Sequence, residues 1–250
     1  MTYENPYINS STWTELNILE TLRKRNPLII CITNDVVRTF TANGLLAIGA
    51  SPVMSECSED LEDLIVHASA LLINIGTVTP DKVTYYKEAI TLAKAHEVPI
   101  VLDPVGCHAG AYRLSVVLDL IKTDAISLLR GNQSEIKAIY DALNTNHKVN
   151  NSLSGKGVDG EQVEDSAIIT YRLARQINCP VVATGEEDYV SDGTRVFAVP
   201  HGHPIMTAVT GTGCLLGAVL AAFFSSYCPF MYNMSIGEFL AYALAYYGLA

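Results

Sequence analysis

A glycine-rich segment near the end of the chain carries residues suited to anion binding. Gly211, Thr212 and Gly213 precede Cys214, and an apolar run rich in Ala and Leu follows over residues 215–224. Glycines allow positive φ and close approach of the backbone to a ligand. The apolar run is typical of a buried helix, whose free N-terminal N–H groups attract an anion and would stabilise a thiolate at Cys214. A tight turn before a packed helix, with Cys214 as an ordinary core residue, explains this segment alone equally well.

Three other residues could complete a site for phosphoryl transfer. That reaction needs an anion cradle, compensation of the nucleotide's charge, and a divalent ion. Arg130 has a planar guanidinium that matches phosphate oxygens. Asp103 and Glu135 have carboxylates that could hold Mg²⁺ directly or through water. The alternative interpretations are structural: a surface salt bridge for Arg130, and a first-turn carboxylate on the helix dipole for Glu135.

Other catalytic motifs are missing from the sequence. It contains no G-x-G-x-x-G after a predicted strand, no G-x-x-x-x-G-K-[ST], no G-x-S-x-G and no H-E-x-x-H. The Gly-Lys pair within residues 155–157 has no Ser or Thr after it, so we expect a surface loop. His201 and His203 could ligate a metal from one face of a strand, but Gly202 and Pro204 favour a loop.

Composition and charge restrict the class of protein and its partners. The 250-residue chain is 49% hydrophobic and 17% charged, as expected for a globular protein. Its formal net charge of −10, from 16 basic and 26 acidic residues, argues against nucleic acid or an anionic membrane as partner. The six cysteines form no C-x-x-C pair and no signal-peptide pattern is present, so we expect free thiols in the cytoplasm.

Strand-like and helix-like segments alternate along the chain. Apolar runs typical of buried strands are expected at 28–32, 50–54, 71–75, 98–102, 125–129 and 180–183. Helical patterns lie between them at 36–48, 59–68, 80–96, 112–122, 134–143 and 164–177, a hairpin follows at 190–199, and a last helix is expected at 236–249. A first helix begins at the capping box Thr12-x-x-Glu15, after a loose tail at 1–10. This order predicts a single α/β domain over residues 1–250, with a mainly parallel central sheet and helices on both faces.

Most predicted strands end in polar or glycine-containing clusters. In parallel sheets of this kind, ligands bind beyond the carboxyl ends of the strands. The clusters are Thr33-Asn34, Asp103-Pro104, Arg130-Gly131-Asn132 and Thr184-Gly185-Glu186. Met54 ends a strand on the same edge, where it could wall an aromatic ligand. Their convergence on one edge of the sheet favours a binding site over separate structural turns.

An ordered series of motifs resembles the hydroxyethylthiazole kinase family of the ribokinase-like superfamily. The motifs run from about residue 26 to 220 and comprise 26–28, 31–37, 40–47, 49–54, Asn74-Ile75-Gly76-Thr77, Asp103-Pro104-Val105-Gly106, Arg130-Gly131-Asn132 with Ser134-Glu135, 155–159, 184–188 and 209–214. The resemblance implies a ribokinase-like fold and the ATP- and Mg²⁺-dependent phosphorylation of 4-methyl-5-(2-hydroxyethyl)thiazole in thiamine salvage. It also implies a homotrimer with active sites at the subunit interfaces.

The same resemblance implies roles for individual residues. Met54 and Gly211 would contact the thiazole alcohol, with Asn34 nearby, and Arg130 and Thr184 would contact ATP. Asn132-x-x-Glu135 looks like the magnesium-associated motif of the superfamily, and Asp103 is a further candidate metal ligand.

Cys214 stands where ribokinase-like relatives usually have an aspartate that acts as base for the hydroxyl. A helix N-terminus would lower the pKa of its thiol and nearby phosphates would raise it, so we expect a weak base. Most of the catalysis would come from the backbone amides of residues 211–213, from Mg²⁺ and from Arg130.

Three features depart from the family pattern. Cys107-His108-Ala109-Gly110 replaces the usual Gly-Ala-Thr, Ile30 stands where His is usual, and relatives typically continue past Ala250 through another helix. The altered loop at 107–110 and the short C-terminus motivate a second hypothesis, a thiazole-binding protein without turnover. A transferase that uses Cys214 as its nucleophile is a third hypothesis.

Overall fold

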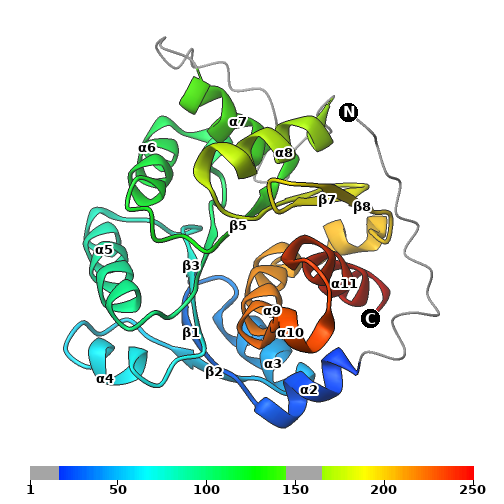
Figure 1. Cartoon of the computed structure of the whole chain (residues 1–250). Helices are drawn as coiled ribbons and strands as arrows, with labels where there is room; N and C mark the ends of the chain where they lie inside the picture. The colour runs from blue at the N-terminus through cyan, green and yellow to red at the C-terminus, as the bar shows by residue number, and fades with distance from the viewer. Residues whose placement is uncertain (1–16, 145–164) are drawn as a thin grey trace.

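Parallel strands form the centre of the molecule. The computed structural model describes residues 17–144 and 165–250, and this part of the chain contains one eight-stranded sheet (Figure 1). The strands are β1 (Leu28–Ile32), β2 (Ser51–Met54), β3 (Ala70–Asn74), β4 (Ile100–Asp103), β5 (Leu128–Asn132), β6 (Val181–Thr184), β7 (Asp188–Ser191) and β8 (Val196–Val199), in the spatial order β2-β1-β3-β4-β5-β6-β7-β8. Neighbours from β2 to β6 pair parallel, and β7 is antiparallel to β6 and β8. The predicted mainly parallel sheet is confirmed.

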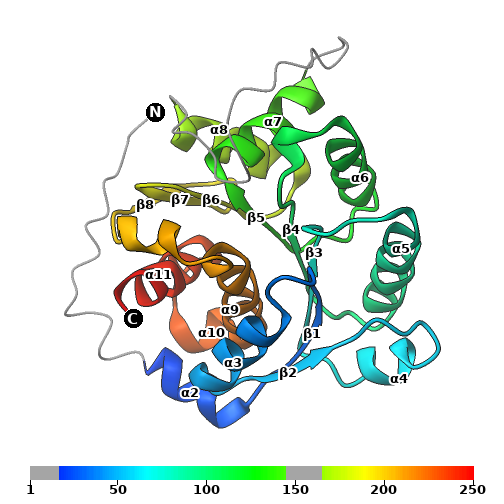
Figure 2. The same ribbon diagram turned by 180° about the vertical axis from the view of Figure 1, so that it is seen from behind.

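Helices cover both faces of this sheet (Figures 1 and 2). One face carries α2 (Ile18–Arg25), α3 (Arg38–Ile48), α9 (Thr212–Ser226), α10 (Pro229–Tyr232) and α11 (Ile236–Leu249), and the other carries α4 (Leu61–Ile65), α5 (Pro80–Ala95), α6 (Ala111–Ile121), α7 (Gln133–Asn144) and α8 (Ser166–Ile177). Alternate strand residues point to opposite faces. In β1, Ile29 and Cys31 join the α9 core, whereas Ile30 and Ile32 join the core under α5.

Local sequence explains where the helices around the site begin. Thr79 caps α5, because its hydroxyl oxygen accepts a hydrogen bond from Lys82 N at 3.2 Å, and Pro80 is the first helical residue. Ser235 caps α11 in the same way and accepts from Glu238 N at 3.2 Å. The predicted cap of α5 and the predicted last helix are both confirmed. The capping box at 12–15 and the Gly-Lys segment at 155–157 lie outside the described residues.

Several expected boundaries are wrong by a few residues. The fifth strand begins at Leu128 rather than at Ala125, because Asp124 adopts φ 51° and the chain turns before it enters the sheet. Ala125 and Ile126 still pack against the core, which explains why their apolar character resembles a strand. The helix expected at 59–68 is shorter, and α10 and two 3₁₀ turns, η1 (Cys107–Ala109) and η2 (Pro204–Ala208), were not anticipated.

The chain order reverses at β1, which creates a topological switch point. From β1 the chain passes to β2 on one side and then to β3 on the other. Such a reversal leaves a crevice beyond the carboxyl ends of the two neighbouring strands, where α/β proteins bind ligands. None of the described helices is both long enough and apolar enough to cross a bilayer.

Candidate functional site

The start of α9 has the backbone geometry of an anion site. Gly211 is the N-cap with φ 93°, and a Cβ at this position would lie 2.5 Å from Val37 Cγ1, so glycine is required here. The first bond across this turn runs from Leu215 N to Gly211 O at 2.8 Å. The N–H groups of residues 212–214 therefore have no acceptor within the helix. The predicted glycine turn at a helix start is confirmed.

Arg130 lies under this helix start rather than on the surface. It is 6% exposed although it belongs to β5. Its Nη2 donates to Thr184 Oγ1 at 2.8 Å, and its Nη1 lies 3.5 Å from Asp103 Oδ2. A Cβ at Gly213 would lie 3.2 Å from Nη2, so the guanidinium faces the first turn of α9. The surface-salt-bridge interpretation of Arg130 is wrong.

Asp103 is a fully buried carboxylate, and one of its oxygens has no partner among the described residues. Its Oδ2 accepts from Asn74 Nδ2 at 2.8 Å and faces Arg130. Its Oδ1 has no hydrogen-bond partner among the described residues. Burial raises the pKa of Asp103 to about 6, and Arg130 opposes that shift.

Glu135 holds two loops together through its carboxylate. Oε1 accepts from Gly106 N and Oε2 accepts from Asn132 N, each at 2.7 Å, and Asn132 Oδ1 accepts from Glu135 N at 2.8 Å. Burial, with the charge of Asp103 as a second cause, raises the pKa of Glu135 to about 7. Both of its oxygens are thus already engaged by backbone N–H groups.

The described part of the chain contains no group of three or more His, Cys, Asp or Glu side chains that could hold a metal ion. His203 uses its ring as a helix cap, since Nδ1 accepts from Ile205 N at 3.1 Å at the start of η2. The structure therefore favours the loop interpretation of His201 and His203.

A chain of side-chain amides links Asp103 to Cys214. Asn74 Oδ1 accepts from Asn34 Nδ2 at 2.9 Å, and the same Nδ2 lies 3.3 Å from Cys214 Sγ. Asn34 Oδ1 in turn accepts from Val36 N at 3.1 Å. Asn74 was missed as a site residue, although it ends β3 directly beside Asp103 in the sheet register. It fixes the amide orientation of Asn34 at the switch point between β1 and β3.

Cys214 differs from the expectation for a thiol at a helix start. Burial, followed by the charge of Asp103, raises the pKa of Cys214 to about 11. Desolvation therefore outweighs any stabilisation of a thiolate by the helix start, and a thiol that keeps its proton is consistent with the weak base expected from the sequence. At neutral pH this group is a half-buried thiol, hydrogen-bonded to Asn34.

Met54 lies at the end of the edge strand of the sheet. It pairs with Cys31 in the register of β2 and β1, is half-buried, and packs against the core under α9. The structure thus places Met54 and Asn34 after neighbouring strands on the same edge.

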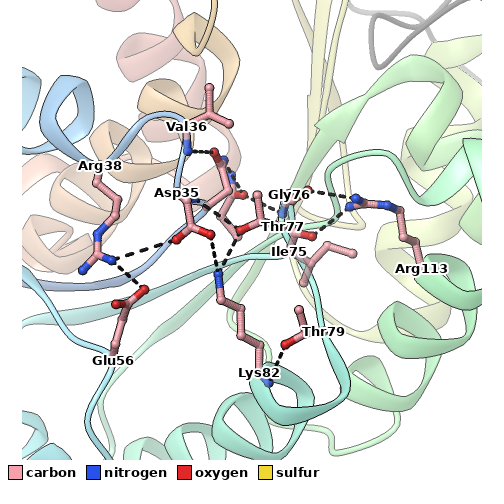
Figure 3. Close-up of polar contacts among 12 residues, drawn as sticks. Asp35, Val36, Arg38, Glu56, Ile75, Gly76, Thr77, Thr79, Lys82 and Arg113 are labelled. Atoms are coloured by element: carbon pink, nitrogen blue, oxygen red, sulfur yellow. Dashed lines mark hydrogen bonds and ion pairs between the residues drawn. The ribbon is translucent and has the colours of Figure 1, made fainter.

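Ion pairs and carbonyl contacts brace the loops around Asn34 (Figure 3). Lys82 Nζ donates to Asp35 Oδ2 at 3.0 Å and to Thr77 Oγ1 at 2.9 Å, and Arg38 pairs with Glu56 at 2.6 Å. These ion pairs are one brace, and Arg113 is a second. Its guanidinium donates to the carbonyl oxygens of Ile75 and Gly76, each at 2.9 Å, and of Val105 at 3.1 Å. Neither brace was anticipated, because the spacing of charges in the sequence does not say which loops meet.

Comparison with known proteins identifies the family. The profile of the hydroxyethylthiazole kinase family matches residues 19–248. The chain belongs to this family. A hydroxyethylthiazole kinase of Streptococcus agalactiae is 53% identical over 208 residues, which cover 83% of this chain and 78% of the relative.

Solved structures agree with the hydroxyethylthiazole kinase family assignment. The hydroxyethylthiazole kinase protein of Pyrococcus horikoshii OT3 superposes with a TM-score of 0.81 at 36% identity, over 95% of this chain and 84% of that one. A ribokinase-like superfamily protein of Enterococcus faecalis V583 matches with a TM-score of 0.60 at 14% identity, over 92% and 84%. The second match concerns the fold alone, and together they confirm the expected ribokinase-like architecture.

The structure shows what surrounds two residues that depart from the hydroxyethylthiazole kinase pattern, Cys107 and Ile30. Cys107 begins the η1 turn, where its Sγ contacts Glu135 O at 3.6 Å and its backbone follows the Gly106 amide bound by Glu135. Ile30 is fully buried in the apolar core below α4 and α5. Both residues therefore pack into the scaffold of the site.

Proposed function

We propose that this protein phosphorylates the hydroxyl group of 4-methyl-5-(2-hydroxyethyl)thiazole with ATP, in thiamine biosynthesis or salvage. One observation carries the proposal: the first turn of α9 lies against buried Arg130 at Gly213 and contacts Asn34 through Cys214 Sγ. A phosphate and an alcohol can therefore be held against the same turn. The names of the relatives supply the identity of the alcohol. The site lies on one sheet, which supports a single kinase domain.

The reaction would be an in-line transfer of the γ-phosphoryl group to the substrate hydroxyl. Arg130 and Thr184 would bind ATP, and the backbone amides of residues 211–213, of which those of 212 and 213 have no acceptor within the helix, would stabilise the charge on the transferred group. Gly211, Met54 and Asn34 would orient the thiazole alcohol. Cys214, a thiol at neutral pH, is a poor proton acceptor, so positioning and charge stabilisation would supply most of the rate.

Mg²⁺ fits the acidic part of the site. Asp103 Oδ1 is a buried oxygen without a partner among the described residues, as expected for an oxygen that ligates a cation. Glu135 would act through water, because its two oxygens accept backbone N–H groups. A bound Mg²⁺ would neutralise charge on the phosphate oxygens. It would also favour the ionised forms of Asp103 and Glu135, since the charge of Asp103 now opposes the ionisation of Glu135.

We propose that the protein forms a homotrimer in the cytoplasm, with its active sites at the subunit interfaces. Four large apolar side chains are exposed on two segments that meet at the glycine turn, 36–40 and 205–209: Val36, Phe40, Ile205 and Val209. Phe40 lies within 3.4 Å of a Cβ at Gly211, so this apolar surface borders the site and would be covered by a neighbouring subunit. All six cysteines are free, which supports a reducing compartment.

One assay tests the activity. The protein is incubated with the thiazole alcohol and Mg-ATP, and the phosphate ester and ADP are measured by mass spectrometry. Both products are expected, and Cys214→Ala should form them at a reduced rate. Ligand binding without product would favour the binding-protein hypothesis. Complete loss in Cys214→Ala, with a covalent adduct on the wild type, would favour the nucleophile hypothesis. Light scattering with and without ligand gives the mass of the assembly.

A further inference from the structure

Tyr247 reaches the glycine turn from the last described helix. Its hydroxyl donates to the carbonyl oxygen of Thr212 at 2.7 Å. Thr212 is the first residue of α9 and Tyr247 lies near the end of α11, and these two helices lie side by side (Figures 1 and 2). Burial raises the pKa of Tyr247 to about 12, so the hydroxyl keeps its proton at neutral pH and remains a donor.

This hydrogen bond acts on the peptide unit that joins Thr212 to Gly213. A peptide is planar, so the Thr212 carbonyl and the Gly213 N–H lie in one plane and point in opposite directions. Fixing the carbonyl oxygen therefore fixes the direction of the N–H. That N–H belongs to the first turn of α9 and has no acceptor within the helix. A bond to the carbonyl also polarises the peptide and makes its N–H a better donor.

The other side of the same peptide faces Arg130. A Cβ at Gly213 would lie 3.2 Å from Arg130 Nη2 and 3.4 Å from Nη1, so the backbone here lies against the guanidinium. Thr212 is held independently through its side chain, because Oγ1 donates to Met206 O at 3.0 Å. The carbonyl is thus held by α11, while the hydroxyl is held by η2.

Close packing keeps α11 in place for this contact. A Cβ at Gly248 would lie 2.5 Å from His201 O, so glycine lets the end of α11 approach the loop before η2. The neighbouring Tyr246 points to a different environment, where its ring packs on Phe223 with centroids 5.7 Å apart. Of these two tyrosines, Tyr247 is therefore the one that meets the first turn of α9.

We propose that Tyr247 is a positioning residue that orients the Gly213 amide toward the transferred phosphoryl group. It acts through the peptide plane and needs no contact with substrate. The inference rests on the proposed phosphotransfer function of the site, and it adds a residue from a helix that carries none of the predicted site residues.

The test compares Tyr247→Phe with Tyr246→Phe. Each variant keeps the ring and removes one hydroxyl, and both positions are half-buried on the same helix. Loss of one ordinary hydrogen bond in the transition state should lower kcat of Tyr247→Phe by about 3- to 10-fold. The KM for the thiazole alcohol should stay within about twofold, as should both constants in Tyr246→Phe. Assays run well below both unfolding midpoints, so that altered stability does not contribute.

A binding measurement separates this inference from the proposed function. Mg-ADP with aluminium fluoride mimics the transferred phosphoryl group, and Tyr247→Phe should bind it more weakly by the same factor as the loss in kcat. A kcat and an affinity both within twofold of wild type, or equal losses in the two tyrosine variants, would overturn the inference. If the wild type binds this complex but does not phosphorylate the thiazole alcohol, the proposed function fails and the binding result alone decides the role of Tyr247.

Discussion

The phosphate end and the alcohol end of the site satisfy their polar groups in different ways. Asp103, Glu135 and Arg130 are 0%, 3% and 6% exposed and bond to one another or to backbone. At the alcohol end, the Lys82–Asp35 pair keeps 24% and 57% of its side chains exposed, and Val36 is 70% exposed. Buried charges must be compensated within the fold, whereas exposed pairs contribute little. Most buried polar groups of the phosphate end therefore have partners within one chain, apart from Asp103 Oδ1 and Arg130 Nε, whereas the alcohol end keeps exposed side chains among the described residues.

Removing Arg130 should give the largest effect on both activity and stability. Arg130→Met leaves Asp103 as an uncompensated buried charge, so we expect a loss of about 3–5 kcal/mol in the free energy of unfolding. The kcat/KM for ATP should fall by roughly 100-fold or more, because a desolvated charge contact is lost. Steady-state kinetics and urea unfolding measure the two effects.

Arg113→Met is the matched control for this variant. It also removes a guanidinium, but one that donates to backbone carbonyls and braces the loops after β3 and β4. It should lower stability while the KM for ATP stays unchanged. Unchanged ATP kinetics in Arg130→Met would show that the buried arginine is structural and would remove the distinction between the two ends.

The buried carboxylates should make stability depend on pH. The folded-state pKa of Glu135 is raised to about 7 and that of Asp103 to about 6, so the folded protein binds more protons than the unfolded chain between pH 4 and 7. The free energy of unfolding should therefore be highest below the unfolded-state pKa values and fall as pH rises toward 7. Urea unfolding of the metal-free protein at several pH values measures this slope.

Glu135→Gln isolates the carboxylate part of that slope. The variant cannot ionise at residue 135, so its stability should change less between pH 5.5 and 7.5, by about 1–3 kcal/mol. All other ionisable side chains are present in both proteins, so the comparison cancels their contribution. Parallel slopes in the two proteins would mean that Glu135 is ionised throughout this range.

Cys214 sits between the two ends, and changing it should have a smaller effect on turnover. Because its thiol is protonated at neutral pH, Cys214→Ala should lower kcat only by a few-fold, which corresponds to about 1 kcal/mol. Cys214→Asp should retain or increase turnover, since a carboxylate accepts a proton more readily. The kcat of both variants is compared with that of Cys214→Ser at matched pH. Loss of turnover in Cys214→Asp, with substrate binding and fold intact, would contradict this account.

The sequence was informative wherever a short pattern has one physical solution. The glycine turn before an apolar run located the start of α9, and Thr79-Pro80 located the start of α5. The ends of parallel strands converge by geometry, which placed Asn34, Asp103 and Thr184 on one edge. These inferences depend on neighbours in sequence or on the direction of strands, and both can be followed without coordinates.

Contacts between distant segments could not be predicted in the same way. The sequence does not indicate that both oxygens of Glu135 accept backbone N–H groups, or that the Tyr247 hydroxyl donates to the Thr212 carbonyl. The sequence predicted a weak base at Cys214 but not burial as the main cause of its raised pKa, because burial depends on what packs around the first turn of α9. Pairing partners and desolvation are properties of the packed molecule.

The smallest expected effect concerns the exposed ion pair at the alcohol end of the site. Lys82→Met removes the Lys82–Asp35 pair and should change the free energy of unfolding by less than about 1 kcal/mol. The matched control is Lys122→Met, which removes an exposed pair with Asp119 at 3.1 Å on α6 and its following turn. The two variants should unfold alike in urea.

Kinetics then distinguish a pair beside the site from a pair elsewhere on the surface. Asp35 adjoins Asn34, so Lys82→Met should raise the KM for the thiazole alcohol by about 2- to 3-fold, less than 1 kcal/mol, and leave the KM for ATP unchanged. Lys122→Met should change neither constant. If Lys82→Met instead cost several kcal/mol, or lowered turnover as far as Arg130→Met, the alcohol end would be as strongly preorganised as the phosphate end. The exposed fraction of the side chains would then not indicate which end of the site needs its surrounding contacts for activity.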